Sequence, residues 1–141
     1  MSCGSLKSMP LPSTLTSIGT YGLAGTAFTS ITIPYGVTAI GNLALYNCQK
    51  LVNVTLPTSV TRIGDEAFLS SGKLERVLIP SSVTYIGFNA FKNCVALKSL
   101  TLPPKITSIS ANLCYQCYAL KSIVIHSNIT LIGDHAFNPH P

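Results

Sequence analysis

The sequence predicts a solenoid, an elongated coil of stacked repeats, because one pattern returns every 23 residues. A leucine or isoleucine followed by proline opens the successive units, at Leu11, Ile33, Leu56, Ile79 and Leu102. The first interval is 22 residues, and a further unit opens at Ile125, where histidine replaces the proline. Units of this length cannot bury their apolar faces alone, so they stack and share one core. Hydrophobic residues make up 47% of the chain and charged residues only 9%, which fits a core-rich coil and excludes a disordered chain.

Fixed positions within each unit carry apolar residues whose side chains should face inward. The eighth position is isoleucine in every unit, and the nineteenth is leucine or phenylalanine. We therefore expect a stacked core that includes Ile40, Leu51, Ile63, Leu74, Ile86, Leu97, Ile109 and Leu120. Because one unit fixes many backbone torsions for few buried side chains, this core becomes stable only when neighbouring units cover each other.

Two segments of each unit have the pattern of short strands. The first precedes the proline and alternates, as in Val54-Thr55-Leu56, so its outer residues should be buried and its middle residue exposed. Proline ends this strand because it lacks a backbone N–H. The second follows the proline as Val-Thr-x-Ile and ends at a glycine, which indicates a backbone conformation that other residues reach at a cost. Ser110 stands in this glycine column, so its unit should differ slightly from the others.

A third segment, Gly-x-x-Ala-Phe-x-x-Cys, completes the unit. Its inward positions have helical spacing, as Ala67, Phe68 and Ser71 illustrate, but the segment is short. The sequence therefore predicts one or two helical turns or a 3₁₀ segment here.

The repeats run through the whole chain, which indicates a single domain over residues 1–141. It comprises about five full units with partial units at both ends, since the first half-unit spans Cys3 to Met9 and the last ends after Phe137. Because neither end shows a polar capping repeat, we expect a segment of a longer array whose uncapped ends could self-associate. The first residues show no signal peptide, and no apolar stretch is long enough for a membrane span.

The repeat pattern is clearest in segments 56–68 and 79–94, which read LPTSVTRIGDEAF and IPSSVTYIGFNAFKNC. At these residues the chain resembles the BspA-like, or Treponema-type, leucine-rich repeat family. The resemblance implies a leucine-rich-repeat solenoid, α/β to mostly β, that forms a curved right-handed coil. A parallel sheet would line its concave side, with short helical, 3₁₀ or extended segments on the convex side.

The same resemblance implies a functional setting. Members of the family are often cell-surface or secreted proteins of bacteria and parasitic protists, and some are adhesins that bind host proteins. The family has no catalytic motif, so the resemblance transfers no active-site residue to this chain. We therefore expect no enzyme activity and no cofactor.

The Cys-x-x-Cys segment 114–117 has the spacing of a redox or metal motif, but the repeat explains it more simply. Cys117 falls one period after Cys94 in a column that also holds Cys48, and Cys114 falls in a phenylalanine column. Buried free thiols are therefore favoured, since cysteine packs as a small apolar residue. A disulfide and a metal or redox site are the alternatives, although stacked side chains point the same way and the five cysteines are odd in number.

Two further motifs have an ordinary explanation. His126, His135 and His140 gather near the C-terminus without a set of ligands at metal-site spacing, so surface roles are favoured. The threonine column from Thr16 to Thr130 suits an outward strand position better than an ice-binding face, because threonine is β-branched and polar.

The segments 53–55 and 128–130 match the acceptor pattern for N-glycosylation at Asn53 and Asn128. The repeat consensus supplies these threonines, which favours a chance match and leaves the use of either site open. A glycan on Asn53 would block the strand face as a binding surface.

The charge pattern argues against two other classes of function. The net charge of +5 comes from nine lysines and arginines without a run of adjacent bases, which is not the pattern of a nucleic-acid groove. The four acidic residues form no paired carboxylates, and no glycine-rich phosphate loop is present. We expect neither nucleic-acid binding nor catalysis.

Function should lie where the units differ. The outward positions of the first strand are mostly small and polar, and Arg76 and Leu78 interrupt them. With their neighbours they predict a partner-binding patch that comprises Asn53, Glu75, Arg76, Leu78, Lys98 and Lys121. A shallow sheet with a central arginine suits a protein partner, because arginine is enriched at interface hot spots. The second candidate is the aromatic turn edge, with Tyr21, Tyr46, Phe88, Tyr115 and Tyr118.

The sequence thus predicts a non-catalytic binding or adhesion module that presents its repeat surface to a protein or glycan, on a host or another surface. The alternative function is structural, namely a repeat segment that self-associates end to end or serves as an intracellular scaffold.

Overall fold

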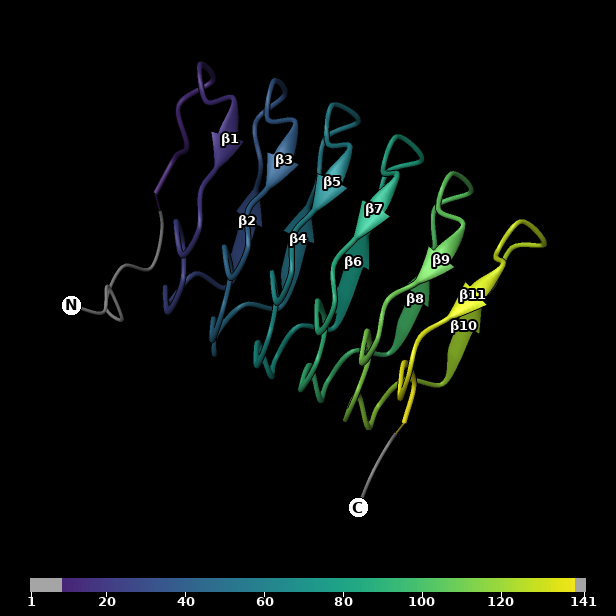
Figure 1. Cartoon of the computed structure of the whole chain (residues 1–141). Coiled ribbons are helices and arrows are strands. Elements are labelled where there is room, and N and C mark those ends of the chain that lie inside the picture. Colours follow the sequence, from purple (N-terminus) through teal and green to yellow (C-terminus); the bar gives the residue numbers. More distant parts are fainter. Residues whose placement is uncertain (1–8, 139–141) are drawn as a thin grey trace.

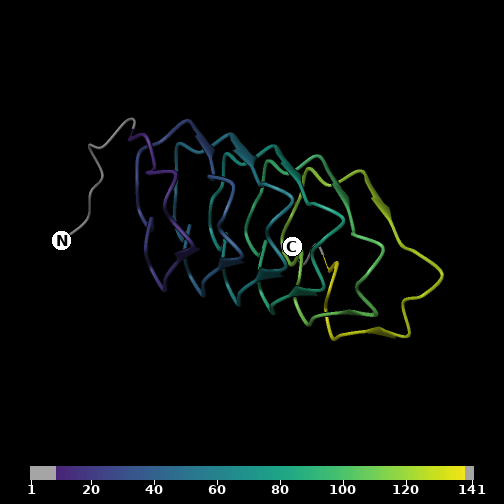
Figure 2. The ribbon, with the colours of Figure 1, turned by 90° about the horizontal axis from the view of Figure 1, so that it is seen from above.

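A computed structural model describes residues 9–138, and these residues form a coil of stacked turns with eleven short strands and no helix. Figures 1 and 2 show the turns following one another along one axis, with the earliest and latest strands at opposite ends. Cys3, Leu6, Lys7 and His140, which the sequence assigns to repeat columns or to the C-terminal tail, lie outside the described residues. The predicted solenoid of 23-residue repeats is confirmed.

Each unit contributes one strand to each of two faces. We call the first the long-strand face. It consists of the three-residue strands β2 (Ser30–Thr32), β4 (Asn53–Thr55), β6 (Arg76–Leu78), β8 (Ser99–Thr101) and β10 (Ser122–Val124). We call the second the short-strand face. It consists of the two-residue strands β1 (Ser17–Ile18), β3 (Ala39–Ile40), β5 (Arg62–Ile63), β7 (Tyr85–Ile86), β9 (Ser108–Ile109) and β11 (Leu131–Ile132).

Neighbouring strands pair in parallel and in the register of the repeat. On the long-strand face Asn53 of β4 lies opposite Arg76 of β6, and on the short-strand face Ile40 of β3 lies opposite Ile63 of β5. The predicted alternation is confirmed on the long-strand face, where Val54 is buried and Thr55 is exposed. Equivalent residues of successive units therefore lie one above the other (Figure 1).

The core runs along the axis between the two strand faces and the turns. Seven of the eight predicted core residues are at most 4% exposed, namely Ile40, Leu51, Ile63, Leu74, Ile86, Leu97 and Ile109. The eighth, Leu120, is only partly buried, because no described residue follows it in its column. Ile132 in the last described unit is likewise 52% exposed. Burial in this coil thus depends on the neighbouring unit, as expected for a stack of repeats.

The segment that was expected to be helical is a pair of tight turns. Two residues four apart take left-handed backbone conformations in five successive units, for example Leu43 with φ of 56° and Asn47 with φ of 54°. Residues with such torsions interrupt a right-handed helix. Their N–H groups bond to the next unit, as in the 2.9 Å bond from Asn47 N–H to the Leu69 carbonyl. The helical prediction was wrong because a ladder between units satisfies the groups that a helix would bond internally.

The glycine column is required by the close approach of the units and not by an unusual torsion. The glycines with positive φ are Gly25 and Gly36, and neither belongs to this column. A Cβ atom added to Gly64 would lie only 2.7 Å from the backbone nitrogen of Asn42. At Gly19, in the first described unit, the same Cβ would meet nothing within 4 Å. The expected special conformation was therefore wrong, and the column excludes side chains because the preceding unit occupies their space.

The ladder of the short-strand face is interrupted beside Ser110, the residue that follows β9 and replaces glycine in this column. No strand pairing joins β6 to β8 or β7 to β9. Gly87 donates its N–H to the Ile63 carbonyl of the preceding unit at 3.0 Å, whereas Ser110 bonds the Ile86 carbonyl through its hydroxyl at 2.6 Å. The turn ladder continues, with Phe91 N–H bonded to the Leu113 carbonyl at 2.9 Å. The unit of Ser110 thus differs from the others in the missing pairing of β9 with β7, while its turn ladder is intact. The missing pairing of β6 with β8 lies on the other strand face, between the two preceding units.

Candidate binding face

The long-strand face presents an exposed array of side chains that is mostly small and polar. Its outward residues are Ser30, Thr32, Asn53, Thr55, Arg76, Leu78, Ser99, Thr101, Ser122 and Val124, all of which are exposed. Leu78 is 80% exposed, the highest value among the exposed large apolar side chains of residues 9–138. Because most of its surface is exposed, this side chain contributes little hydrophobic stabilisation to the fold and is open to contact by a partner.

The six predicted patch residues fall into two adjoining groups. Asn53 and Arg76 lie opposite each other on β4 and β6, and Leu78 continues along β6. Glu75, Lys98 and Lys121 occupy one column just before the strands, each one unit from the next. The backbone keeps this column in register, since Lys98 N–H bonds the Glu75 carbonyl at 3.2 Å and Lys121 N–H bonds the Lys98 carbonyl at 3.1 Å. The patch is therefore continuous along the coil.

The charged groups of the patch have different partners. Lys98 Nζ contacts Glu75 Oε2 at 2.6 Å, and this exposed ion pair, helped by Arg76, holds the pKa of Glu75 below its ordinary value. Within residues 9–138, the guanidinium of Arg76 makes no hydrogen bond or ion pair. The other arginine of the strand faces, Arg62, stacks over the ring of Tyr85 with its guanidinium carbon 3.9 Å from the ring centre. Arg76 is thus the strand-face arginine whose hydrogen-bond donors are available to a partner.

A cavity of about 380 Å³ opens on this face between β6 and β8. It is lined by Arg76, Val77, Leu78, Ile79, Ser99 and Thr101. The cavity lies where the pairing of β6 with β8 is missing, so the interruption of the ladder and the hollow coincide. Sequence reasoning identified Arg76 and Leu78 but missed Ile79, Ser99, Thr101 and the cavity itself. Apart from Arg76 and Leu78 themselves, no departure from the repeat in the sequence marks this cavity.

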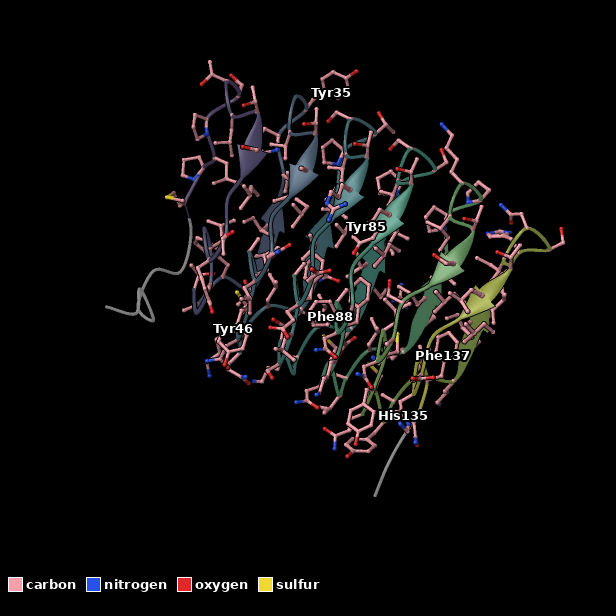
Figure 3. The ribbon with its side chains drawn as sticks, viewed as in Figure 1. Tyr35, Tyr46, Tyr85, Phe88, His135 and Phe137 are labelled. Carbon is pink, nitrogen blue, oxygen red and sulfur yellow. The ribbon has the colours of Figure 1, made fainter. Side chains whose placement is uncertain are left out.

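The aromatic turn edge is less available than the sequence indicates. Tyr46 packs edge-on against Tyr21 with ring centres 6.3 Å apart, and Tyr115 packs against His135 at 6.4 Å while Lys92 lies over its ring. Tyr46, Tyr85, Phe88 and His135 are labelled in Figure 3, which shows them spread over different units. Tyr21, Tyr46 and Tyr115 thus make edge-on contacts with a neighbouring unit, while Phe88 and Tyr118 are 45% and 55% exposed.

Near Tyr85, a polar cluster on the short-strand face satisfies itself. The Tyr85 hydroxyl donates to Asp65 Oδ1 at 3.1 Å, and the Phe88 N–H donates to the same oxygen at 3.2 Å. Partial burial and the hydrogen bond to Asp65 raise the pKa of Tyr85. Because Arg62 also covers the ring, these groups already have partners within the chain.

The described cysteines are buried free thiols, as the repeat columns predict. Cys94 Sγ donates to the Phe68 carbonyl at 3.2 Å, and Cys117 Sγ donates to the Phe91 carbonyl at 3.0 Å. Burial raises the pKa of Cys94 well above its ordinary value, and a hydrogen bond with Cys117 together with burial raises the pKa of Cys114. Such thiols are poor nucleophiles, because the thiolate is the reactive form.

Ser71 stands in the cysteine column and shows what the column does. Its hydroxyl donates to the buried Leu45 carbonyl at 2.8 Å and accepts the Cys48 N–H at 3.1 Å. Thiol and hydroxyl side chains at this position thus satisfy backbone groups inside the coil. The Cys-x-x-Cys spacing follows from this structural column and the neighbouring packing column.

The remaining polar motifs also have structural partners. The Thr84 hydroxyl donates to the Thr61 carbonyl of the preceding unit at 3.2 Å, so the threonine column braces adjacent units. The Asn128 amide donates to the carbonyls of Pro104 and Ile106, which engages the nitrogen that a glycan would occupy. Asn53, in contrast, is exposed. Among residues 9–138, no group of three or more His, Cys, Asp or Glu could hold a metal ion.

The stacked parallel strands and the turns between them define a leucine-rich-repeat solenoid. A profile of the BspA type leucine rich repeat region matches residues 16–140 in six copies. The chain belongs to the BspA-type leucine-rich repeat family, as the sequence resemblance predicted. A search of curated proteins found no match. The comparisons add no enzyme family.

Solved structures of bacterial leucine-rich repeat proteins have the same fold. The T. pallidum leucine rich repeat protein TpLRR is 24% identical, with a TM-score of 0.62 over 84% of this chain and 67% of its own. The pneumococcal vaccine antigen PcpA is 21% identical, with a TM-score of 0.65 over 89% of this chain and 40% of its own. A leucine rich cell surface protein of Faecalibacterium prausnitzii is 25% identical, with a TM-score of 0.53 over 82% of this chain and 43% of its own. This chain thus spans only part of the length of each of these proteins.

Within residues 9–138, no helix could cross a lipid bilayer, as the absence of any helix from these residues requires.

Proposed function

We propose that this chain is a non-catalytic binding module that presents the long-strand face to a protein partner. One observation carries the proposal. Arg76, whose guanidinium has no partner, and Leu78, which is 80% exposed, both line a cavity in the middle of the face. Arginine and large apolar side chains at a desolvated centre, surrounded by small polar groups, are the anatomy of a protein interface.

The setting of this function is proposed from the chain's relatives. One solved structure of the same fold is described as a cell surface protein and another as a vaccine antigen. These descriptions support a cell surface as the setting in which the face meets its partner, and adhesion or secretion is part of the proposal. A glycan partner is less well supported, because three of the five rings of the turn edge make edge-on contacts with rings of a neighbouring unit.

The proposal is tested by charge reversal in the centre of the face. Surface proteins that the immobilised chain captures are purified, and their affinity is measured by biolayer interferometry for wild-type chain, Arg76→Glu and Lys50→Glu. Lys50 is an exposed cation on an earlier turn, so the two variants change the net charge equally. We expect Arg76→Glu to weaken binding at least tenfold and Lys50→Glu to leave it nearly unchanged. Equal affinity of Arg76→Glu and wild type would exclude this face.

End-to-end assembly is the second candidate function. The last described unit exposes Ile125, Leu131 and Ile132 by 43%, 61% and 52%, and a strand edge lies beside them. An apolar end with an open edge suits a further repeat, which a second copy of this chain could supply. Light scattering coupled to size-exclusion chromatography decides: a mass that rises with concentration supports assembly, and a constant monomer mass excludes it.

A further inference from the structure

The cavity between β6 and β8 lies where two neighbouring strands of the long-strand face do not pair. β4 pairs with β6 and β8 pairs with β10, but no pairing joins β6 to β8. The two units are held at one end of the gap by the Lys98–Glu75 ion pair and by the Lys98 N–H bond to the Glu75 carbonyl. The gap is thus a groove with a fixed boundary, and it is specific to this place in the repeat.

The lining of the groove combines one cation, two hydroxyl groups and aliphatic walls. Arg76 contributes a guanidinium that has no hydrogen bond or ion pair within residues 9–138. Ser99 and Thr101 contribute hydroxyl groups from the opposite strand, and Leu78 and Ile79 contribute the apolar surface. A guanidinium binds a carboxylate through two parallel hydrogen bonds, a geometry that a lysine does not provide.

The charge around the groove favours an anion. Glu75 is the only acid beside the long-strand face in the described part of the chain, and Lys98 already pairs with it. The other three acids, Asp65, Glu66 and Asp134, lie in the turns that follow the short-strand face. Arg76 and Lys121 therefore leave this face with uncompensated positive charge, which attracts an acidic partner and disfavours a basic one.

We propose that the β6–β8 groove binds an acidic side chain of an extended protein segment, with a neighbouring aliphatic side chain packed on Leu78 and Ile79. Arg76 binds the carboxylate, and the hydroxyls of Ser99 and Thr101 donate further hydrogen bonds to it. The cavity of about 380 Å³ contains the acidic side chain. The inference rests on the proposed function, because it names the chemistry of the partner that the long-strand face recognises.

The test uses peptides of defined sequence as the probe. Fluorescence anisotropy measures binding of labelled hexapeptides in which glutamate, glutamine or lysine alternates with leucine, and of one in which glutamate alternates with glycine. The groove predicts that the glutamate–leucine peptide binds about tenfold or more tighter than the glutamine–leucine and lysine–leucine peptides, since a charged hydrogen bond is the difference. It also predicts weaker binding of the glutamate–glycine peptide, which lacks the aliphatic contact.

Matched variants assign the effect to the groove. Arg76→Gln should remove the preference for glutamate over glutamine, and Leu78→Ser should remove the preference for leucine over glycine. Lys50→Gln, with the same loss of charge as Arg76→Gln, should change neither. Circular dichroism checks that each variant keeps the fold. We expect it to do so, because Arg76 and Leu78 are both exposed.

Three results would overturn the inference: equal binding of the glutamate and glutamine peptides, no binding of the glutamate–leucine peptide up to about 1 mM, or an equal effect of Lys50→Gln and Arg76→Gln. These outcomes separate the two proposals. If a captured protein binds Arg76→Glu more weakly while the glutamate and glutamine peptides bind equally, the face binds proteins but the groove does not select carboxylates. If charge reversal on the face changes no protein's affinity while the peptides do show the preference, the proposed function fails instead.

Discussion

Substitution of Gly64 by alanine tests how the units of this coil are held together. A Cβ atom at this position would lie 2.7 Å from the backbone nitrogen of Asn42, closer than real Cβ contacts allow. The two units must therefore separate locally. Separation breaks the Gly64 N–H bond to the Ile40 carbonyl (2.8 Å) and strains the Thr61 N–H bond to the Thr38 carbonyl (2.9 Å).

The expected loss of stability follows from these contacts. Two backbone hydrogen bonds contribute about 0.5–1.5 kcal/mol each, and overpacking costs about 1–3 kcal/mol. Alanine returns about 0.4–1 kcal/mol, because it restricts the unfolded chain. We therefore expect Gly64→Ala to lower the free energy of unfolding by about 1–6 kcal/mol. Urea denaturation followed by circular dichroism measures the change.

Gly19→Ala is the matched control, because it makes the same substitution in the same column. The added Cβ would meet nothing within 4 Å, and Gly19 does not have a positive φ. We expect its free energy of unfolding to be unchanged or to rise by about 0.4–1 kcal/mol. Equal losses of stability at the two positions would contradict the steric explanation. They would indicate that the glycines of this column are required for their backbone conformation.

Ser110→Gly reverses the one natural exception in the column. Removal of the side chain lets the Ile86 carbonyl accept the backbone N–H of residue 110, as the other glycines of the column arrange. We expect pairing of β7 with β9 to form and the amide of Thr107 to become protected from hydrogen exchange. Unchanged exchange at Thr107 would show that serine does not cause the interruption.

Three further predictions concern the core and the charged patch. Ser71→Ala leaves the buried Leu45 carbonyl without its hydroxyl donor and should lower the free energy of unfolding, measured by urea denaturation, by about 1–3 kcal/mol. Ser71→Cys should lower it less, because the Cys94 thiol of the same column donates to a carbonyl in the same way. Cys94 should react with a thiol reagent only after unfolding, since burial raises its pKa, and fast reaction of the folded protein would contradict this. The pKa of Glu75 is lowered by Lys98, so the stability of the ion pair is present above the ordinary glutamate pKa and is lost as pH falls through the lowered value. In NMR titration Lys98→Gln should return the pKa of Glu75 toward its ordinary value, and no change would show that the pair does not form in solution.

The parts of the fold that were predicted correctly are those in which the burial of each residue follows from the repeat pattern alone. The buried isoleucine and leucine columns, the alternation of Val54 and Thr55, and the buried thiol of Cys94 all follow from apolar periodicity at a fixed repeat. The patch residues Asn53, Arg76 and Leu78 were identifiable because they depart from the repeat, although their binding role remains a proposal.

The parts that the sequence did not predict depend on contacts between units. Helical spacing in the third segment was misleading, because the left-handed torsions at Leu43 and Asn47 are stabilised by bonds to the next unit and leave no mark in the sequence of their own unit. Glycine in the Gly64 column has the same appearance whether it supplies a torsion or avoids a collision, and only the preceding unit distinguishes the two.

The repeat length, the stacked core, the family and the residues that break the pattern were all predictable from the sequence. The spacing between units was visible only in the folded coil. The pairing of β7 with β9 is missing beside Ser110, and the pairing of β6 with β8 is missing on the other strand face, where a groove places Arg76 and Leu78 opposite Ser99 and Thr101 of the next unit. A periodic pattern specifies which face of each unit is buried, whereas the distance between two units depends on steric contacts between residues 23 positions apart.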